Sequence, residues 1–476
     1  SIYQRTGVNH VDGVDHAPGV LTETALRYAK AFGSKFAFKV NGSYMHGIDW
    51  VSNSTQDQNP NNLPSANPAY PALNGASNTA YDGWNRYGDD ALAGSNLVSI
   101  SGLTINGKTN QTLRVARTGY YEKDLVNPEV KNLKFDAAFH YKPNDHTEMV
   151  YSYRIGDMDG TFQRGNKIRL DGVIVQNHKL EVKGKNFKIL SYISLENTGN
   201  SYNVKPLADN LDLYSGGSNS AWAAKYRTAL VNQLNNGADL ATANNMARAA
   251  ADAGRVLPGT QAFNDLKNTI IGINNWDIRS SLIPTAPLTG GAALVQKSRM
   301  YHLEGQWDLS KTVKLFDLLV GADARLYQII PDGNNFVDFS RSIADRNQPL
   351  TDGSFGSNVY YKKVGGFAQG TKTFFDEKLK IVGSLRFDYN PYYDPKVTPR
   401  IAAVYSPTDN HNFRINFQQG YRFPSLFEAL SYVNNGRVKR VGSLSFIDEG
   451  LGYLENSYTQ ASVVKFNNAV SAAGNT

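Results

Sequence analysis

The stretch from Leu379 to Pro424, LKIVGSLRFDYNPYYDPKVTPRIAAVYSPTDNHNFRINFQQGYRFP, contains three runs in which apolar and polar residues alternate. In the first run, Leu385 and Phe387 alternate with Arg386 and Asp388. Side chains of a strand point alternately to opposite faces, so each run predicts a strand with one apolar and one polar face. We expect these strands to belong to a membrane barrel, with the apolar face toward lipid and the polar face toward the lumen.

The same alternation recurs along the whole chain and predicts about 12 strands. Those before the opening stretch are expected at Ala25–Phe32, Phe36–Trp50, Leu133–Tyr141, Thr147–Ile155, Val173–Lys183, Phe187–Asn197, Ser298–Trp307, Val313–Gln328 and Val359–Phe374. The segment from Gly156 to Gly160 is predicted to be a loop, and so is the chain from Ser1 to Leu21.

The connections between the predicted strands alternate between tight turns and long segments. The long segments are residues 51–128, 199–293, 329–357 and 425–476, and we expect two short helices in the second of them, one within residues 221–254 and one at residues 263–270. A β-sandwich or propeller has no reason to keep every second connection short. The pattern therefore predicts an all-β, antiparallel transmembrane β-barrel with short periplasmic turns and long extracellular loops.

Composition excludes several classes of protein. Hydrophobic residues make up 41% of the 476 residues, but no run of about 18 apolar residues exists, which excludes a helical membrane protein. The absence of cysteine removes disulfides and thiolate chemistry. The net charge is +7 with both signs scattered, so no nucleic-acid partner is indicated. No catalytic motif is present, and we expect no enzyme activity, cofactor or metal.

Two sets of residues are candidates for contact with a ligand. The polar residues predicted to face the lumen include Lys39, Arg154, Arg386, Asp388, Arg400 and Arg414. The aromatic residues of the long loops are Tyr81, Trp84, Tyr87, Trp222 and Trp276. Flat aromatic rings on loops can stack on sugars or aromatic chelators, although they can equally pin a loop onto itself. The excess of basic residues on the polar face would suit an anionic substrate such as a ferric siderophore.

Two segments near the C-terminal end resemble TonB-dependent outer-membrane receptors. These are Val397–Pro407, VTPRIAAVYSP, and Phe413–Ser425, FRINFQQGYRFPS. The motif residues of the second segment are Gly420, Tyr421, Arg422 and Pro424. Segments around Leu26–Phe32 and Ser425–Leu451 look like receptors of the Bacteroidota type.

The resemblance implies a 22-stranded barrel in the outer membrane of a Gram-negative cell, closed by an N-terminal plug with a TonB box. Its partners would be the TonB complex, acting through the plug, outer-membrane lipid, and a small-molecule or oligosaccharide substrate of the siderophore, cobalamin or glycan class. No plug is recognisable here, and about 12 strands are too few. We therefore expect residues 1–476 to be part of one barrel domain, an internal fragment lacking the plug and the C-terminal strands. A passive porin or channel and a non-transporting surface adhesin remain alternatives.

Overall fold

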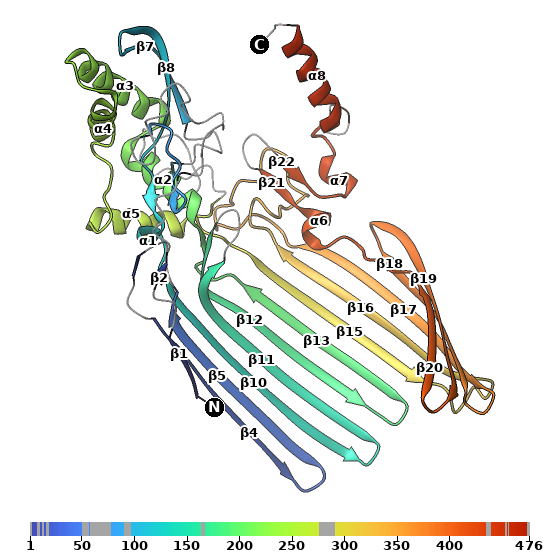
Figure 1. Cartoon of the computed structure of the whole chain (residues 1–476). Helices are drawn as coiled ribbons and strands as arrows, with labels where there is room; N and C mark the ends of the chain where they lie inside the picture. The colour runs from blue at the N-terminus through green and yellow to red at the C-terminus, as the bar shows by residue number, and fades with distance from the viewer. Residues whose placement is uncertain are drawn as a thin grey trace.

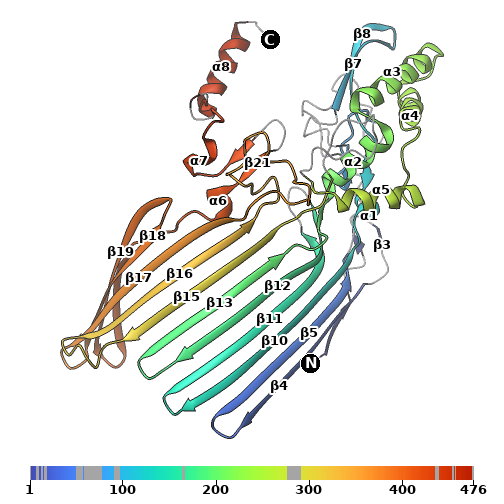
Figure 2. The same cartoon turned by 180° about the vertical axis from the view of Figure 1, so that it is seen from behind.

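The computed structural model describes residues 2–6, 10–11, 14–15, 19–49, 57, 78–89, 97–162, 167–275, 291–434, 439–452, 455 and 457–473. These residues are organised around one large antiparallel sheet, whose strands run side by side with tight turns at one end and all the long connections at the other (Figures 1 and 2).

The sheet contains 14 strands, and twelve of them are long. In spatial order, the strands are β1 (Ile2–Thr6), β4 (Val20–Phe32), β5 (Phe36–Ile48), β10 (Glu129–Asn144), β11 (Thr147–Phe162), β12 (Ile168–Lys183), β13 (Phe187–Asn197), β15 (Lys297–Asp308), β16 (Asp317–Ile330), β17 (Val359–Phe374), β18 (Leu379–Asn390), β19 (Tyr393–Thr408) and β20 (His411–Gln418). The short β14 (Tyr202–Asn203) pairs with β12. The prediction of an all-β antiparallel architecture with about 12 long strands is confirmed.

Several predicted boundaries are confirmed and others are wrong. Strands β13 and β17 have the predicted bounds. The segment Gly156–Gly160, predicted as a loop, lies inside β11, because it pairs on both sides with β10 and β12. Residues Ile2–Thr6 were also expected in a loop but form β1, which pairs with β4. In both places, neighbouring strands supply backbone hydrogen bonds that side-chain alternation does not reveal.

The register of the sheet fixes which side chains share a face, because directly opposite residues in an antiparallel pair project on the same side. A continuous row of pairs links Asn41, Asp136, Arg154 and Asn177. Following such rows places the six polar residues predicted to face the lumen on one face, here called the polar face. They are Lys39, Arg154, Arg386, Asp388, Arg400 and Arg414.

The opposite, apolar face displays most of the large exposed hydrophobic side chains of the sheet. Examples are Leu26, Phe135, Leu303, Phe387 and Ile415. At the loop end of β5, β10 and β11 this face also carries charged residues, and these pair with each other. The pairs are His46 with Glu129 at 3.1 Å, and Lys131 with Asp157 at 3.8 Å and with Asp159 at 3.2 Å. The apolar surface therefore ends at a charged border below the loops.

The first two long segments fold together into one body, here called the loop domain. It consists of β6 (Arg86–Tyr87), β7 (Leu97–Ile105), β8 (Lys108–Ala116), β9 (Tyr120–Tyr121), α1 (Glu122–Leu125), α2 (Val204–Gly216), α3 (Asn219–Asn235), α4 (Leu240–Ala251) and α5 (Gln261–Gly272). Two clusters of buried hydrophobic residues form its core, and each contains residues from both segments.

The prediction of two helices in the second long segment is wrong in number, because the described residues of that segment already form four. A single predicted helix across residues 221–254 is divided into α3 and α4 at Gly237, whose φ of +85° ends a helix. Helix α2 was not predicted. It is stabilised by tertiary burial of Leu207 and Leu211 rather than by its own sequence pattern.

The chain after β20 was predicted to be a loop but contains further structure. Its elements are α6 (Leu426–Leu430), β21 (Tyr432–Asn434), β22 (Lys439–Val441), α7 (Ser445–Asp448) and α8 (Gln460–Ala472). Leu430 and Tyr432 pack with Ile329 of β16 and Tyr361 of β17 in a third hydrophobic cluster. This segment is thus anchored on the loop ends of β16 and β17. None of the helices in the described ranges is long and apolar enough to cross a membrane.

Gly365 in β17 allows a charged contact to pass across a strand. Asp323 of β16, Gly365 of β17 and Asp388 of β18 lie in one row of the polar face. Arg386 of β18 reaches over this row, with its Nη2 atom 2.7 Å from Asp323 Oδ1 and 2.7 Å from Asp388 Oδ1. A Cβ atom at Gly365 would collide with the Arg386 guanidinium and lie 2.7 Å from Asp388 Oδ1. A side chain at this position would therefore have to displace the ends of the Arg386 and Asp388 side chains.

We predict that Gly365→Val destabilises the folded sheet by about 1–3 kcal/mol, because the added atoms must displace Arg386 from Asp323. Gly383→Val is the matched control. An added Cβ at Gly383 of β18 meets nothing within 4 Å, so valine's strand preference should leave stability unchanged or slightly raised. Urea unfolding of the purified protein measures both, and equal effects of the two substitutions would contradict this account.

Candidate ligand-binding site

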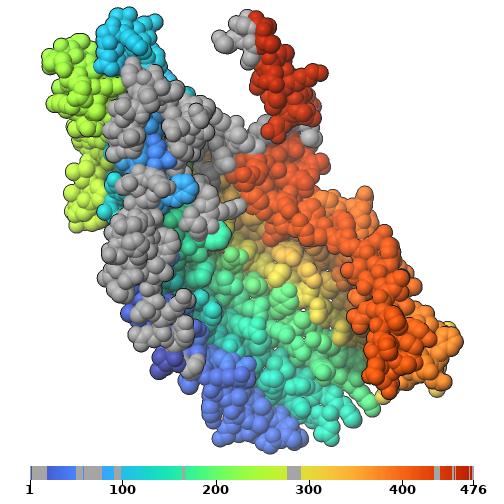
Figure 3. All heavy atoms as spheres, in the orientation of Figure 1, coloured from blue at the N-terminus to red at the C-terminus, as the bar shows by residue number. Residues whose placement is uncertain are grey.

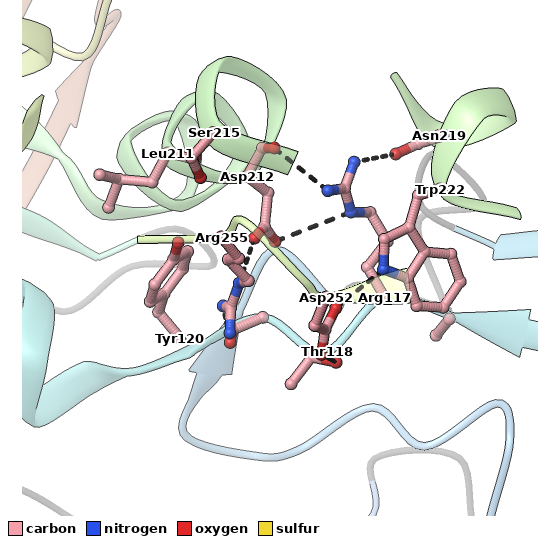
Figure 4. Close-up of polar contacts among 12 residues, drawn as sticks. Arg117, Thr118, Tyr120, Leu211, Asp212, Ser215, Asn219, Trp222, Asp252 and Arg255 are labelled. Carbon is pink, nitrogen blue, oxygen red and sulfur yellow. Dashed lines mark hydrogen bonds and ion pairs between the residues drawn. The ribbon is translucent and has the colours of Figure 1, made fainter. Parts of the chain in front are cut away.

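A buried charged cluster joins the two long segments of the loop domain (Figure 4). Asp212 of α2 is almost fully buried and lies between two arginines. Arg255 Nε is 2.5 Å from Asp212 Oδ1, and Arg117 Nε is 3.9 Å from Asp212 Oδ2. Burial raises the pKa of Asp212, and the two guanidinium groups oppose that rise. Because Arg117 belongs to the first long segment and the others to the second, the cluster fixes the two segments to each other.

Trp222, a predicted ligand contact, belongs to this same structural core. Its side chain is fully buried, stacks on Tyr226 with ring centroids 5.3 Å apart, and donates from Nε1 to Asp252 Oδ1 at 2.8 Å. Thr118 Oγ1 also donates to the Asp252 carboxylate. A ligand would reach Trp222 only if this core opened. The ligand contact predicted for Trp222 remains a prediction.

The other predicted aromatic residues differ in accessibility. Tyr81 is 7% exposed and lies beneath the Arg86 guanidinium. Tyr87 is half-buried, and its hydroxyl donates to Glu122 Oε2 at 3.3 Å. Trp84 is 60% exposed, whereas Trp276 lies outside the described residues. The structure thus brings Tyr81, Trp84 and Tyr87 together in one short segment and leaves Trp84 as the most accessible ring of the three.

A separate pocket of about 540 Å³ lies at the loop end of the sheet, on the polar side. Its walls are the ends of strands β13 and β15–β17 together with the segment that follows β20, which lies over these strand ends in the space-filling view (Figure 3). Lining residues include Glu196, Tyr327, Phe336, Lys363, Arg422 and Phe423. We call it the mouth pocket. Its lining combines aromatic rings with cationic groups, as a site for a partly aromatic anion requires.

Positive charge is concentrated at the mouth pocket. Lys363 Nζ lies 5.1 Å from the ring centroid of Tyr361 and 5.8 Å from those of Tyr327 and Phe423. Arg325 is directly opposite Lys363 across β16 and β17, an arrangement of like charges that costs stability. Among the described residues, no carboxylate forms an ion pair with Lys363. An anion bound at this position would relieve the repulsion between the two cations.

The motif around residues 420–425 positions α6 above the mouth pocket. Ser425 Oγ accepts from the Glu428 backbone N–H at 3.3 Å, and Glu428 Oε2 accepts from the Ser425 N–H at 2.7 Å, which is a capping box. Arg422 Nη2 donates to Glu428 Oε1 at 3.0 Å. These contacts, led by the Ser425 hydrogen bond, lower the pKa of Glu428 to about 2. The polar motif residues therefore begin a helix and tie its first turn to Arg422.

The remaining motif residues attach this segment to the sheet. Pro424 accepts through its carbonyl oxygen from the Tyr361 hydroxyl at 3.2 Å. Tyr421 packs edge-on against the buried Phe423 ring, and Lys396 of β19 lies over Tyr421. Gly420 lies in the irregular segment that follows β20, and an added Cβ there would meet nothing within 4 Å. The motif thus has a structural role that the sequence did not reveal.

A charged network continues from the mouth pocket along the polar face. Arg325 Nε donates to His302 Nδ1 at 3.2 Å, so that Nδ1 must be an acceptor. His302 Nε2 therefore carries the proton and donates to Glu304 at 3.0 Å. Arg325 also lies 3.8 Å from Asp323, which binds Arg386. Side chains of β15, β16 and β18 are thereby connected below the pocket.

Sequence reasoning did not identify Lys363, Tyr327 or Phe423 as parts of a site. The alternation in β17 assigns Lys363 to the polar face, but only the register with β16 places it opposite Arg325. Phe423 joins them because the chain returns over the strand ends. The described residues contain no group of three or more His, Asp or Glu side chains that could hold a metal ion.

The sequence matches the family described as "TonB dependent receptor-like, beta-barrel" over residues 190–448. The match covers more than half of the chain and includes the strands and the motif that form the mouth pocket. The chain belongs to this family of TonB-dependent receptor barrels. No curated protein sequence matches the chain.

Solved structures that resemble the chain include bacterial receptors. A mutant of the ferric enterobactin receptor PfeA from Pseudomonas aeruginosa is 10% identical with a TM-score of 0.42, and the match covers 90% of this chain and 44% of that one. The siderophore receptor PirA from the same organism is 7% identical (TM-score 0.38; 86% and 41% covered). The FrpB iron transporter from Neisseria meningitidis is 10% identical (TM-score 0.38; 85% and 45% covered). The chain therefore spans less than half the length of these receptors.

Removing the buried charge of the loop domain should loosen it. We predict that Asp212→Asn destabilises this domain by about 3–5 kcal/mol, because two buried guanidinium groups lose their counter-charge. Asp265→Asn on the exposed side of α5 is the control and should change stability by less than about 0.5 kcal/mol. Hydrogen exchange of α2–α4 amides in the full receptor reports the effect, and unchanged protection in Asp212→Asn would refute the assigned role.

The motif should respond to acid in a defined direction. The folded-state pKa of Glu428, about 2, lies below its ordinary value of 4.5. The carboxylate therefore stabilises the start of α6 above about pH 4.5, and this contribution is lost as pH falls toward 2. Pulsed hydrogen exchange of the α6 amides should show a difference between the native protein and Glu428→Gln at pH 7 that disappears near pH 2. A difference that persists at pH 2 would count against the ionised capping box.

Proposed function

We propose that the chain is part of an outer-membrane receptor of the Bacteroidota type that takes up a scarce nutrient with energy delivered by TonB. The observation that carries the proposal is the mouth pocket, which lies at the loop end of a family barrel, on the polar face of the sheet. In the outer membrane of a Gram-negative cell, the apolar face would contact lipid and the polar face would line the lumen. A ligand captured among the loops would thus meet the mouth pocket before the charged network beneath it.

The chemistry of the pocket supports an anionic substrate with flat or apolar parts. Lys363 and Arg422 in its lining, and Arg325 opposite Lys363, supply positive charge, and the rings of Tyr327 and Phe423 supply apolar surface. Among the siderophore, cobalamin and glycan classes, a ferric siderophore combines these properties best. Trp84, Tyr81 and Tyr87, and the less accessible Trp222 and Trp276, are proposed contacts for first capture on the loop side.

The proposed energy source is the TonB complex, acting through a plug domain of the whole receptor. Family membership supports this partner. The lumen-facing residues Lys39, Arg154, Arg386, Asp388, Arg400 and Arg414 would then contact a polar plug and water. Charges of both signs on one wall are suited to such a contact, because a moving polar surface can exchange partners on it without facing a uniform field.

We predict that cells carrying the full receptor accumulate one class of labelled ligand from a panel of ferric siderophores, cobalamin and oligosaccharides, and that a protonophore abolishes the accumulation. Lys363→Gln should raise the ligand concentration for half-maximal uptake by about tenfold, the effect of losing one contact to a charged group. The matched control is Lys372→Gln, the same substitution on the same strand but on the apolar face near the turn end, which should leave uptake unchanged.

Two outcomes would replace the proposal. Uptake that continues at the same rate with the protonophore would indicate a passive porin or channel. Ligand or cell adherence without accumulation would indicate an adhesin. Equal effects of Lys363→Gln and Lys372→Gln would remove the mouth pocket from the path of the substrate even if energised uptake is found.

A further inference from the structure

A second concave site lies on the apolar face, at the loop end of β12, β13 and β15. It is a groove of about 760 Å³. Apolar side chains form its floor, and cationic side chains lie at its upper border. The floor residues include Ile174, Ile193, Leu195 and Tyr301, and the cations are Lys297 and Arg299. Leu195 is directly opposite Arg299, and Ile193 is directly opposite Tyr301, so these residues share one face.

The two cations of this groove differ from the other charges at the same border. On β5, β10 and β11, His46 and Lys131 have carboxylate partners within 4 Å. Lys297 and Arg299 form no ion pair with any residue in the described ranges, and both are exposed. Being two residues apart on one strand, they lie about 7 Å apart on the same side.

No acidic side chain on the same face of these strands could neutralise them, although Glu196 also lines the groove from the polar side of the sheet. The described positions of β13, β15, β16 and β17 on the apolar face include no Asp or Glu. Lys362 of β17 adds a third cation two strands away on the same face. The closest carboxylate in the strand pairing, Glu196, belongs to the polar side, where Ser298 donates to it at 3.4 Å. The border of the apolar face over these strands is therefore positive.

The uncharged polar groups around the groove already have partners. Tyr301 donates through its hydroxyl to Gln328 Oε1, and Tyr153 donates to Gln176 Oε1, both at 3.3 Å. The Tyr151 hydroxyl lies 2.9 Å from His178 Nδ1. Hydrogen-bonded polar groups can lie against an apolar environment at small cost, whereas two adjacent cations require an anion. The two cations of the groove therefore still lack a negatively charged partner.

We propose that this groove binds a lipid whose headgroup is anionic and carries phosphate, with the headgroup on Lys297 and Arg299 and the acyl chains on Ile174, Ile193 and Leu195. The assignment rests on the proposed outer-membrane location. An anion that reaches the two cations there must bring an apolar part to cover the floor of the groove. A guanidinium binds phosphate through two parallel N–H groups, which a second lysine would not provide.

The experiment is native mass spectrometry of the purified full receptor in detergent, with phosphatidylglycerol and phosphatidylcholine of identical acyl chains. The native protein should bind phosphatidylglycerol more tightly. Arg299→Gln should weaken that binding about fivefold and the double variant Lys297→Gln/Arg299→Gln about 25-fold, at about fivefold for each cation near an anionic headgroup. Phosphatidylcholine binding should not change. Lys372→Gln, an apolar-face lysine at the opposite end of β17, is the matched control and should bind both lipids as the native protein does.

The same experiment distinguishes the proposed lipid from other molecules that could occupy the groove. Equal binding of the two lipids by the native protein, or no loss in the double variant, would overturn the proposal. Complete displacement of phosphatidylglycerol by inorganic phosphate at equal concentration would assign the groove to a soluble anion. A receptor dimer that disappears in the double variant, with lipid binding unchanged, would assign it to a second copy of the chain. None of these measurements requires TonB or substrate, so failure here leaves the uptake proposal standing.

Discussion

The structure depends on one constraint, the backbone register of the antiparallel sheet. Because the side-chain period of a strand is two, a slip of one residue between two strands would exchange their apolar and polar faces. Arg386 would then lie among apolar side chains, and Phe387 would lie on the polar face. The observed register instead places Asp323, Gly365 and Asp388 in one row, and the missing side chain at Gly365 lets Arg386 bind both carboxylates. The charged network of the polar face therefore follows from the pairing of backbones.

The long segments at the loop end of the sheet are subject to a different constraint. Ordering them costs conformational entropy, and this cost must be offset by burial and by contacts between distant residues. The loop domain does this with two hydrophobic cores and with the Asp212 cluster, in which Arg117 contacts a residue 95 positions away. The segment after β20 does it by packing Tyr432 against the ends of β16 and β17. One consequence is that the mouth pocket has a fixed upper wall, because α6 is tied to the sheet through Tyr361 and to Arg422 through Glu428.

The sequence predicts the sheet well because its signal is local. The alternation of apolar and polar residues within single strands predicts the number of long strands, the bounds of β13 and β17, and the face on which Arg386 or Arg414 lies. It does not predict α2, whose apolar residues are stabilised only by the first long segment, and it merges α3 with α4, although Gly237 was a usable signal for a helix end. The mouth pocket could not be predicted, because Lys363, Arg325 and Phe423 meet only through strand pairing and chain return. Trp222 illustrates the same limit, since nothing in its neighbourhood in the sequence shows that it is buried.

The distribution of charge between the two faces of the sheet connects the two proposed sites. Some cations of the sheet have carboxylate partners, as in the network of Arg386 and Asp323 and in the pairs of Lys131 with Asp157 and Asp159. Other cations form no ion pair among the described residues, and they include Lys363 on the polar face and Lys297 and Arg299 on the apolar face. Lys363 is directly opposite Arg325, and Lys297 lies two residues from Arg299, so like charges repel each other in both places at a cost that the surrounding packing must offset. A cation without a carboxylate partner is available to an anionic ligand, because no built-in partner competes with that ligand. The same physical property therefore connects the two proposed sites, with a soluble anion entering from the lumen side and an anionic lipid from the membrane side.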